Sequence, residues 1–267
     1  METRIYTGAL MAIVIIPIIL IGSWLLVGLF GVLTLVATYE ITHLQDDAND
    51  RNRYLYATEL VSSALLYTFL ILYIKNGISL YYAYTMIGLI LLVSVYYYVA
   101  LDDSMKMFLI AALYPSIGFA ALFAFRESGL VDIGYLFLIT VVTDVFAYFV
   151  GINFGKHKLA PTISPKKSIE GSIGGLVFTV IFSLVYIWLT GLNQVLSIEL
   201  SLPLMIVFAA IISIFAQAGD LVASKMKRDH AVKDFSQLFP GHGGVMDRFD
   251  SVLFVGVILF LLSEVIV

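Results

Sequence analysis

Nine apolar runs, each about 20 residues long, follow one another along the chain with short polar stretches between them. A helix of about 20 mostly apolar residues can cross the roughly 30 Å hydrocarbon core of a bilayer. We therefore expect an all-α, polytopic integral membrane protein. The predicted transmembrane helices are residues 4–20, 23–44, 55–74, 80–100, 106–125, 132–152, 171–190, 203–224 and 248–266.

The composition agrees with this class of protein. Of the 267 residues, 61% are hydrophobic and 13% are charged, whereas roughly 25% charged residues are usual in a soluble domain. The net charge of -4 is small, and we expect no nucleic-acid partner. Because the chain has no cysteine, disulfides, thiolate metal sites and a cysteine nucleophile are excluded.

The basic residues predict an orientation in the membrane. If nine spans alternate, all of the 15 basic residues except Lys75 and Arg126 fall on the side of the N-terminus. The positive-inside rule then places the N-terminus and both large polar loops in the cytoplasm, and the C-terminus outside. Only Gly22 and Ser23 separate the first two runs, which could also form one long bent segment. We read the first run as retained, not as a cleaved signal peptide.

Asp144 and Asp220 lie within apolar runs. Counting from Ile133 at ~1.5 Å per residue, Asp144 lies about 17 Å into its helix, near the middle of the hydrocarbon. A carboxylate there costs at least ~3 kcal/mol unless it faces a wet or ion-filled cavity. Asp144 is either a structural residue bonded to a Ser or Tyr of a neighbouring helix, or part of a polar cavity that opens from the cytoplasm. Asp220, about 26 Å from Pro203, is expected near the cytoplasmic face.

The most densely charged stretch, residues 224–250, lies between the last two apolar runs. Asp220 precedes it, and Asp247 and Asp250 occupy the first turn of the helix that follows. The dipole of that helix favours acids there, so these two could be ordinary helix caps. Carboxylates on both sides of a basic, glycine-containing loop are also expected where a cation holds polyphosphate against a membrane.

One helical face carries an acid, a hydroxyl and a cation ahead of this loop. Asp220, Ser224 and Lys227 or Arg228 follow one another at i, i+4 and i+7 or i+8. Such a face could contribute to the same cavity as Asp144.

The second polar loop, residues 155–175, carries a lysine pair. Ser164 and Pro165 predict a turn, from which Lys166 and Lys167 would project positive charge. These lysines either mark the cytoplasmic side and contact anionic lipid, or clamp phosphate together with the N-terminus of the next helix. Neither a P-loop motif nor a dinucleotide-binding motif is present.

Together these residues resemble the signature of the phosphatidate cytidylyltransferases, also called CDP-diacylglycerol synthases. The matching positions are Ser224, Lys227, Arg228, Lys233, Asp234, Ser236, Leu238, Pro240, His242, Gly243, Gly244, Asp247, Arg248 and Asp250. The segment from Asp144 to Gly155 and the SPKKS sequence also resemble the family. The first 130 residues resemble it only in hydropathy and in the number of helices.

The resemblance implies that CTP and phosphatidic acid give CDP-diacylglycerol and pyrophosphate, with Mg²⁺ required. It also implies a membrane lipid environment and a tendency to form homodimers. The reaction needs suppressed repulsion between two anions, alignment for in-line attack at the α-phosphorus, and charge neutralisation on pyrophosphate. Metal ions and lysines can supply all three.

We predict Asp220 and Asp247 as metal ligands, with Asp144 and Asp250 as further members of the shell, because Mg²⁺ is commonly held by one or two carboxylates plus phosphates. Four acids could hold a second cation. Asp220 and Asp247 are predicted to act in catalysis with Lys167 and Arg228. The predicted substrate-binding residues are Lys166, Lys167, Ser224, Lys227, Arg228, Lys233, His242, Gly243, Gly244 and Arg248. His242 could instead be a structural residue of a tight turn.

Two other functions fit part of the sequence. A cytidylyltransferase for another lipid phosphate, such as a polyprenyl phosphate, could have the same nucleotide site. A transporter would also place acids in the membrane, but it should show repeated halves with broken helices. We expect one membrane domain over residues 1–267, with packing helices in residues 1–130 and catalytic helices and loops in residues 131–267.

The N-terminal half carries few polar candidates. Glu40 and His43 end the second apolar run, and Asp102 and Asp103 follow the fourth. We read all four as solvated charges near the cytoplasmic surface, with Glu40 the closest to the boundary.

Overall fold

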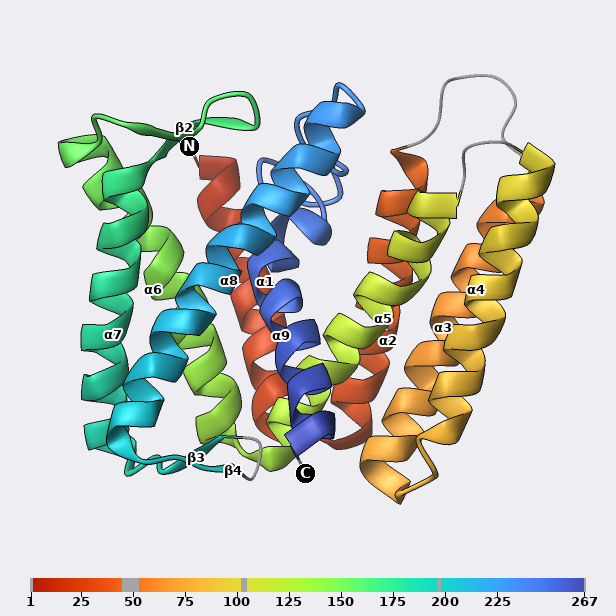
Figure 1. Cartoon of the computed structure of the whole chain (residues 1–267), viewed down its shortest axis with the longest axis horizontal. Helices are drawn as coiled ribbons and strands as arrows, with labels where there is room; N and C mark the ends of the chain where they lie inside the picture. The colour runs from red at the N-terminus through yellow and green to blue at the C-terminus, as the bar shows by residue number, and fades with distance from the viewer. Residues whose placement is uncertain (1, 45–52, 102–104, 196–197, 267) are drawn as a thin grey trace. The chain divides into compact units, whose positions relative to one another are not determined.

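The computed structural model describes residues 2–44, 53–101, 105–195 and 198–266. Asp102 and Asp103 lie outside the described residues. The described chain forms helices at each of the predicted apolar runs (Figure 1). They are α1 (Glu2–Ile21), α2 (Ser23–His43), α3 (Arg53–Asn76), α4 (Tyr81–Leu101), α5 (Met105–Ser128), α6 (Leu130–Phe154), α7 (Ile169–Thr190), α8 (Leu202–Asp229) and α9 (Met246–Ile266).

The helices identify an integral membrane protein. In the described part of the chain, 6 helices are long and apolar enough to cross a bilayer, namely α2, α3, α5, α6, α7 and α8. Shorter apolar segments occur in α1 and α4, over Tyr6–Ile21 and Tyr81–Val95. The predicted fold class is therefore confirmed. By length and composition, six of the nine predicted helices could span a membrane.

The first two apolar runs are separate helices rather than one bent segment. Gly22 has φ of 69° and Ser23 has φ of 55°, so the chain passes through the left-handed region between α1 and α2. Glycine adopts that region at no steric cost, which explains why the break falls at Gly22.

The chain divides into two compact units. The first combines Met1–Ala124 with His230–Phe249, and the second combines Phe125–Asp229 with Asp250–Val267. The charged loop that precedes α9 is thus part of the unit built from the N-terminal helices.

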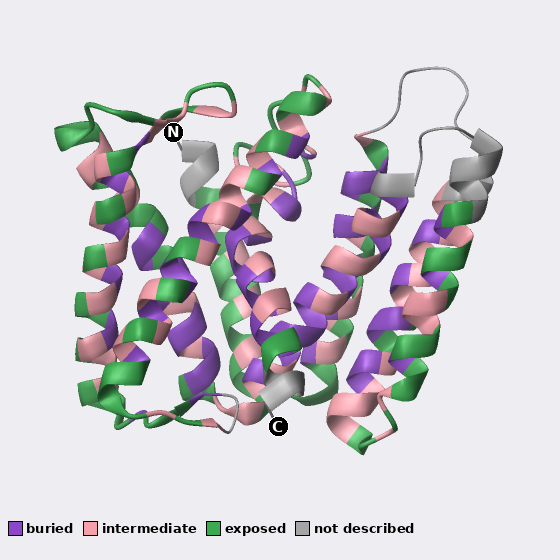
Figure 2. Cartoon of the chain, in the orientation of Figure 1, coloured by how far each residue is buried: buried purple, intermediate pink, exposed green. Residues whose placement is uncertain are grey.

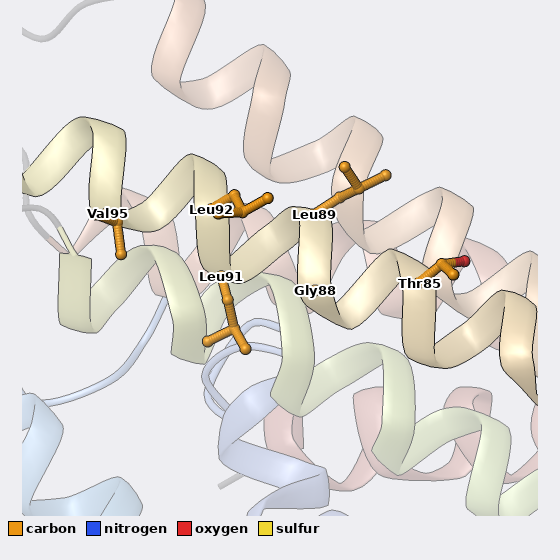
Figure 3. A pocket seen from close by; sticks show the side chains of 6 residues that line it. All are labelled: Thr85, Gly88, Leu89, Leu91, Leu92 and Val95. Atoms are coloured by element: carbon orange, nitrogen blue, oxygen red, sulfur yellow. The ribbon is translucent and has the colours of Figure 1, made fainter.

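Within the first unit, α2 packs against α1 and α3, and α3 packs against α4. A chain of buried hydroxyls connects three helices: the Oγ1 of Thr38 lies 2.8 Å from the Oγ of Ser63, which lies 2.9 Å from the Oγ of Ser116. Each hydroxyl is fully buried. A wide apolar hollow also lies along α4 (Figure 3), and its lining residues are Thr85, Gly88, Leu89, Leu91, Leu92 and Val95.

Within the second unit, α7 packs most extensively against α6, and both contact α8. The buried positions of α7 are Gly171, Gly175, Thr179 and Ser183, spaced four residues apart on one face, while most of its other residues are partly or fully exposed (Figure 2). A Cβ on Gly175 would lie 2.8 Å from the carbonyl oxygen of Thr143. Small residues therefore allow the close approach of α6 and α7, as is common between membrane helices.

Hydroxyls also connect the helices of the second unit. The Oγ1 of Thr143 lies 2.8 Å from the Oγ1 of Thr179 and donates to the Oγ of Ser213 at 2.9 Å. All three residues are buried, so α6, α7 and α8 share a polar contact inside the unit.

Two short antiparallel sheets interrupt the helical fold. The first pairs β1 (Lys158–Ala160) with β2 (Ser164–Ser168), and the second pairs β3 (Gln194–Val195) with β4 (Ile198–Glu199). The predicted turn at Ser164 and Pro165 is wrong, because both residues lie in β2 and the turn falls at residues 161–163. Proline is tolerated in such a strand because both strands of a two-stranded sheet are edges.

Candidate active site

Three carboxylates from three helices come together in the second unit. Asp144 on α6, Asp220 on α8 and Asp250 on α9 are close enough for their charges to repel one another. We call these three residues the acid cluster. Like charges inside a membrane protein are costly unless cations compensate them, so the cluster is a candidate cation site.

Two lysines and a serine of the second unit interact with the acid cluster. The Nζ of Lys167 lies 2.5 Å from the Oδ2 of Asp220, and Lys227 interacts electrostatically with Asp250. The Oγ of Ser224 donates to Asp220 at 3.4 Å, which joins the predicted acid and hydroxyl of the α8 face. These interactions place two lysines beside the three carboxylates.

The contacts of Asp144 fit both interpretations from the sequence, a structural residue bonded to a neighbouring helix and a member of a polar site. The Oγ of Ser251, on α9, donates to the Oδ2 of Asp144 at 3.4 Å, so a serine of a neighbouring helix is indeed a partner. The same carboxylate also faces the charges of Asp220 and Lys167. A hydrogen bond of that length is weak, so Ser251 does not by itself explain an acid within an apolar helix.

The two lysines of β2 have different roles. Successive residues of a strand point to opposite faces, and Lys167 reaches Asp220 while Lys166 is exposed. The two lysines therefore do not project together as predicted. Lys167 lies at the acid cluster, and Lys166 lies at the surface.

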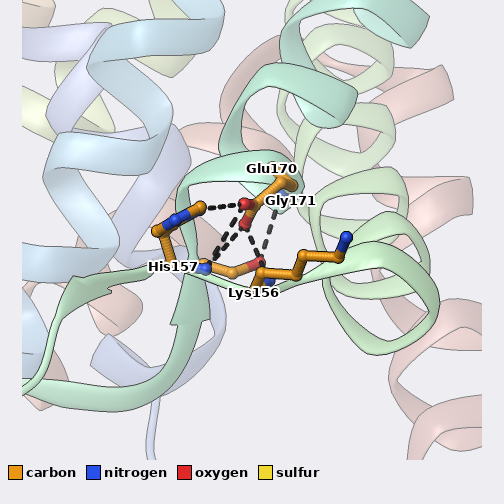
Figure 4. A network of polar contacts seen from close by, with 5 residues as sticks. Lys156, His157, Glu170 and Gly171 are labelled. Atoms are coloured by element: carbon orange, nitrogen blue, oxygen red, sulfur yellow. Dashed lines mark hydrogen bonds and ion pairs between the residues drawn. The ribbon is translucent and has the colours of Figure 1, made fainter.

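The hairpin that carries Lys167 is attached to the first turn of α7. The carboxylate of Glu170 accepts hydrogen bonds from the backbone N–H groups of Lys156 and His157, and lies 2.6 Å from the Nδ1 of His157 (Figure 4). The Oγ of Ser168 caps the helix by accepting from the N–H of Gly171 at 3.1 Å. Sequence reasoning missed this attachment, although a Ser followed by an acid at the start of a helix is a recognisable capping signal.

In the first unit, Asp247 holds the charged loop. Its Oδ2 accepts hydrogen bonds from the N–H of Phe235 at 2.8 Å and from that of Gly244 at 2.9 Å. The tight turn predicted around His242 is present, because the N–H of His242 donates to Phe239 and the N–H of Phe239 donates to Gly243. Gly243 has φ of 79°, a conformation for which glycine is favoured.

Glu40 is a functional candidate that sequence reasoning placed in the wrong environment. It was expected to be a solvated charge, but it is only 1% exposed. Its carboxylate accepts hydrogen bonds from the Oγ of Ser236 and from the N–H groups of Val245 and Met246. A single acid near the end of an otherwise apolar run was the only signal, and its partners lie about two hundred residues further along the chain.

The remaining predicted basic residues lie at surfaces. The helix α8 extends beyond its predicted end at residue 224, so Lys227 and Arg228 occupy its last turn. Arg228, Lys233 and Arg248 are exposed, as expected for side chains that bind a soluble polyphosphate. Asp220 belongs to the second unit and Asp247 to the first, and their sharing of one ion stays a prediction.

The acid cluster by itself is not a complete metal site. Among the described residues, no group of three or more His, Cys, Asp or Glu side chains is placed so that it could hold a metal ion. Mg²⁺ usually keeps several waters and binds through one or two carboxylates plus substrate phosphates. Hard carboxylate oxygens that repel one another are therefore a suitable donor set for Mg²⁺ bound with a nucleotide.

Comparison with known proteins identifies the family of the chain. A sequence model of the Cytidylyltransferase family matches residues 2–266. A phosphatidate cytidylyltransferase of Staphylococcus aureus (strain COL) is 35% identical over 262 residues, 96% of each chain, and one of Staphylococcus epidermidis is 32% identical over the same length. One of Staphylococcus haemolyticus is 46% identical over 147 residues, so that match spans about half of each chain, 55% of this one and 54% of the relative. The chain belongs to the cytidylyltransferase family and is a nucleotidyltransferase.

Proposed function

We propose that the protein transfers CMP from CTP to phosphatidic acid, which gives CDP-diacylglycerol and pyrophosphate. The observation that carries this proposal is the acid cluster, in which Asp144, Asp220 and Asp250 repel one another beside Lys167. Such a site favours a cation together with a polyanionic substrate. The names of the staphylococcal relatives support phosphatidic acid as the lipid.

The reaction is a displacement at phosphorus. A phosphate oxygen of the lipid attacks the α-phosphorus of CTP, and the bond from that phosphorus to the oxygen bridging to the β-phosphorus breaks. Pyrophosphate leaves with that electron pair. Because the attacking monoester is already anionic near neutral pH, no strong general base is needed, and the protein has to align the two anions and reduce their repulsion.

The acids would hold Mg²⁺. Asp220, Asp144 and Asp250 form the shell in the second unit, and Asp247 precedes Asp250 by one helical turn on α9, so we include it. When bound, Mg²⁺ would neutralise phosphate charge and stabilise the departing pyrophosphate. Four acids leave room for a second cation.

The basic side chains would bind the phosphates of the two substrates. Lys167 lies at the acid cluster through its ion pair with Asp220, and Arg228 lies on the last turn of the same helix as Asp220. Exposed cations at the ends of helices and in the loops can meet CTP from the aqueous phase. The other proposed phosphate ligands are Lys166, Lys227, Lys233 and Arg248, with hydrogen bonds from Ser224, His242 and the loop glycines Gly243 and Gly244.

The active site would face the cytoplasm. Both polar loops carry most of the basic residues, and loops rich in Lys and Arg remain on the cytoplasmic side. The N-terminus is then inside and the C-terminus outside. CTP would enter from the cytoplasm, and the lipid would enter laterally from the inner leaflet.

Purified protein in mixed detergent–lipid micelles tests the proposal. We expect pyrophosphate release from labelled CTP with phosphatidic acid, dependent on Mg²⁺, and labelled CDP-diacylglycerol in the lipid phase. A panel that includes polyprenyl phosphate distinguishes the other lipid substrates. Turnover with polyprenyl phosphate alone would replace phosphatidic acid as the substrate, and no turnover with any lipid phosphate would overturn the proposed reaction.

A further inference from the structure

The charged loop of the first unit is attached to α2 through one buried side chain, Glu40. We propose that Glu40 is a positioning residue, which holds residues 236–246 in the conformation that CMP transfer requires without touching either substrate. The inference rests on the proposed function, because it concerns the geometry of the same site.

The hydrogen bonds of Glu40 use both carboxylate oxygens. Its Oε1 accepts from the Oγ of Ser236 at 2.7 Å and from the N–H of Val245 at 2.9 Å, and its Oε2 accepts from the N–H of Met246 at 2.8 Å. The side chain is 1% exposed, so water does not compete for these donors. All three bonds are charge-assisted, and such bonds are roughly twice as strong as neutral ones.

Glu40 also serves as the N-terminal cap of α9. That helix begins at Met246, and the first N–H groups of a helix have no acceptor within it. A negative charge at this end is favoured by the helix dipole. Glu40 therefore defines where α9 begins, and so where Asp247 and Asp250 lie on its first turns.

Gly244 links Glu40 to Asp247. A Cβ on Gly244 would overlap the Glu40 carboxylate, with Oε2 only 2.6 Å away, so a larger residue at position 244 would displace that carboxylate from its present position. The N–H of the same Gly244 donates to the Oδ2 of Asp247 at 2.9 Å. Displacement of the main chain at residues 244–246 would therefore change the position of the Asp247 carboxylate.

The experiment compares Glu40→Gln with Thr34→Val in purified full-length protein. A glutamine keeps the shape of the side chain, but its NH₂ group would face an N–H or O–H donor of the loop. Thr34 is a matched control because it is also buried on α2, and among the described residues its hydroxyl bonds to the carbonyl of Phe30 in the same helix.

We expect Glu40→Gln to lower kcat per folded molecule by about 10- to 100-fold, as is typical when a partner that orients a ligand is lost. The concentration of Mg²⁺ that gives half-maximal rate should rise as well. In the absence of substrates, the amides of residues 244–247 should exchange with deuterium roughly tenfold faster than in the wild type, because their acceptor is weakened. Thr34→Val should resemble the wild type in all three measurements.

The outcomes separate the two proposals. If the wild type is active and Glu40→Gln exchanges faster but keeps the wild-type kcat and Mg²⁺ requirement, Glu40 is only structural and the inference fails. If amide exchange is also unchanged, Glu40 does not hold the loop at all. If the wild type itself transfers no CMP to any lipid phosphate, the proposed function fails instead, and the exchange experiment still tests the attachment.

A second pair of variants covers the case in which Glu40→Gln does not fold. Gly244→Ala should lose activity and thermal stability because its methyl group meets the Glu40 carboxylate. Adding Glu40→Ala removes that overlap, so the double variant should be more stable than Gly244→Ala alone. Strictly additive losses of stability would show that the two positions do not interact and would contradict the geometry on which the inference rests.

Discussion

Two acids of the first unit, Glu40 and Asp247, accept hydrogen bonds from backbone N–H groups, whereas the acid cluster of the second unit brings three acids together. Glu40 and Asp247 accept hydrogen bonds from Val245, Met246, Phe235 and Gly244. The carboxylates of the acid cluster repel one another, and Lys167 forms an ion pair with Asp220. Carboxylates that accept from the main chain help to hold the loop, Asp247 through its Oδ2, whereas acids that repel one another gain most from a bound cation.

The two units also have a common feature, a set of buried hydroxyls that connects three helices. Thr38, Ser63 and Ser116 connect three helices of the first unit, and Thr143, Thr179 and Ser213 connect three of the second. Each unit therefore connects three of its helices through buried hydroxyls. The acid cluster instead brings like charges together, an arrangement that a bound cation would stabilise.

The largest expected effect is the loss of an acid from the proposed metal shell. Asp220→Asn should lower the rate by about 10²- to 10³-fold, the cost typical of losing one electrostatic group that stabilises a transition state. Asp247→Asn should also abolish turnover while the protein still inserts and purifies normally. The measurement is initial rate at saturating CTP, together with yield from the membrane. A near wild-type rate for Asp247→Asn would remove that residue from the shell and assign it to the loop alone.

Lys167 and Lys166 provide the next comparison, within one strand. Lys167→Met should reduce kcat by about 10- to 100-fold because Asp220 loses the cation that orients it. Lys166→Met should mainly raise the KM for CTP, since that side chain is exposed. Steady-state kinetics of the two variants in parallel measure both kcat and the KM for CTP. Equal losses in both would mean that the ion pair with Asp220 is not what distinguishes them.

Cation binding should stabilise the second unit more than the first. Adding the Mg²⁺–CTP complex at about 100 times its dissociation constant should stabilise the wild type by about 2.7 kcal/mol, seen as a higher midpoint of thermal unfolding in detergent. Asp144→Asn should reduce this shift and leave the unfolding midpoint without ligand unchanged or higher, because one repelling charge is removed. A full ligand shift in Asp144→Asn would exclude the residue from the cation site.

The smallest expected effects concern the buried hydroxyls that connect helices within each unit. Thr38→Val and Thr143→Val should each destabilise the protein by roughly 0.6 kcal/mol, the average for hydrogen bonds between membrane helices, with little change in kcat. Unfolding in a titration with denaturing detergent measures both. If Thr143→Val instead removed activity, the hydroxyls of the second unit would have to be counted with the acid cluster.

Much of the fold and part of the site could be predicted because the underlying signals are local. Each apolar run had to become a helix in a bilayer, and the structure has a helix at every one, with ends shifted by a few residues. The acids Asp144, Asp220 and Asp250 stood out because a charge within an apolar run is costly wherever the chain folds. The sequence pattern around residues 224–250 was long enough to indicate the family.

The tertiary structure decided which residues act together, because those contacts connect distant parts of the chain. Glu40 bonds to Ser236 and Met246, which are 196 and 206 residues away, and no local pattern distinguishes such an acid from a solvated one. The different positions of Lys166 and Lys167 depend on a strand that the lysine and proline content did not suggest. Hydropathy acts on each segment separately, so the sequence alone determined the helices and the deep acids. The partners of each charged group follow from packing, which only the folded chain specifies.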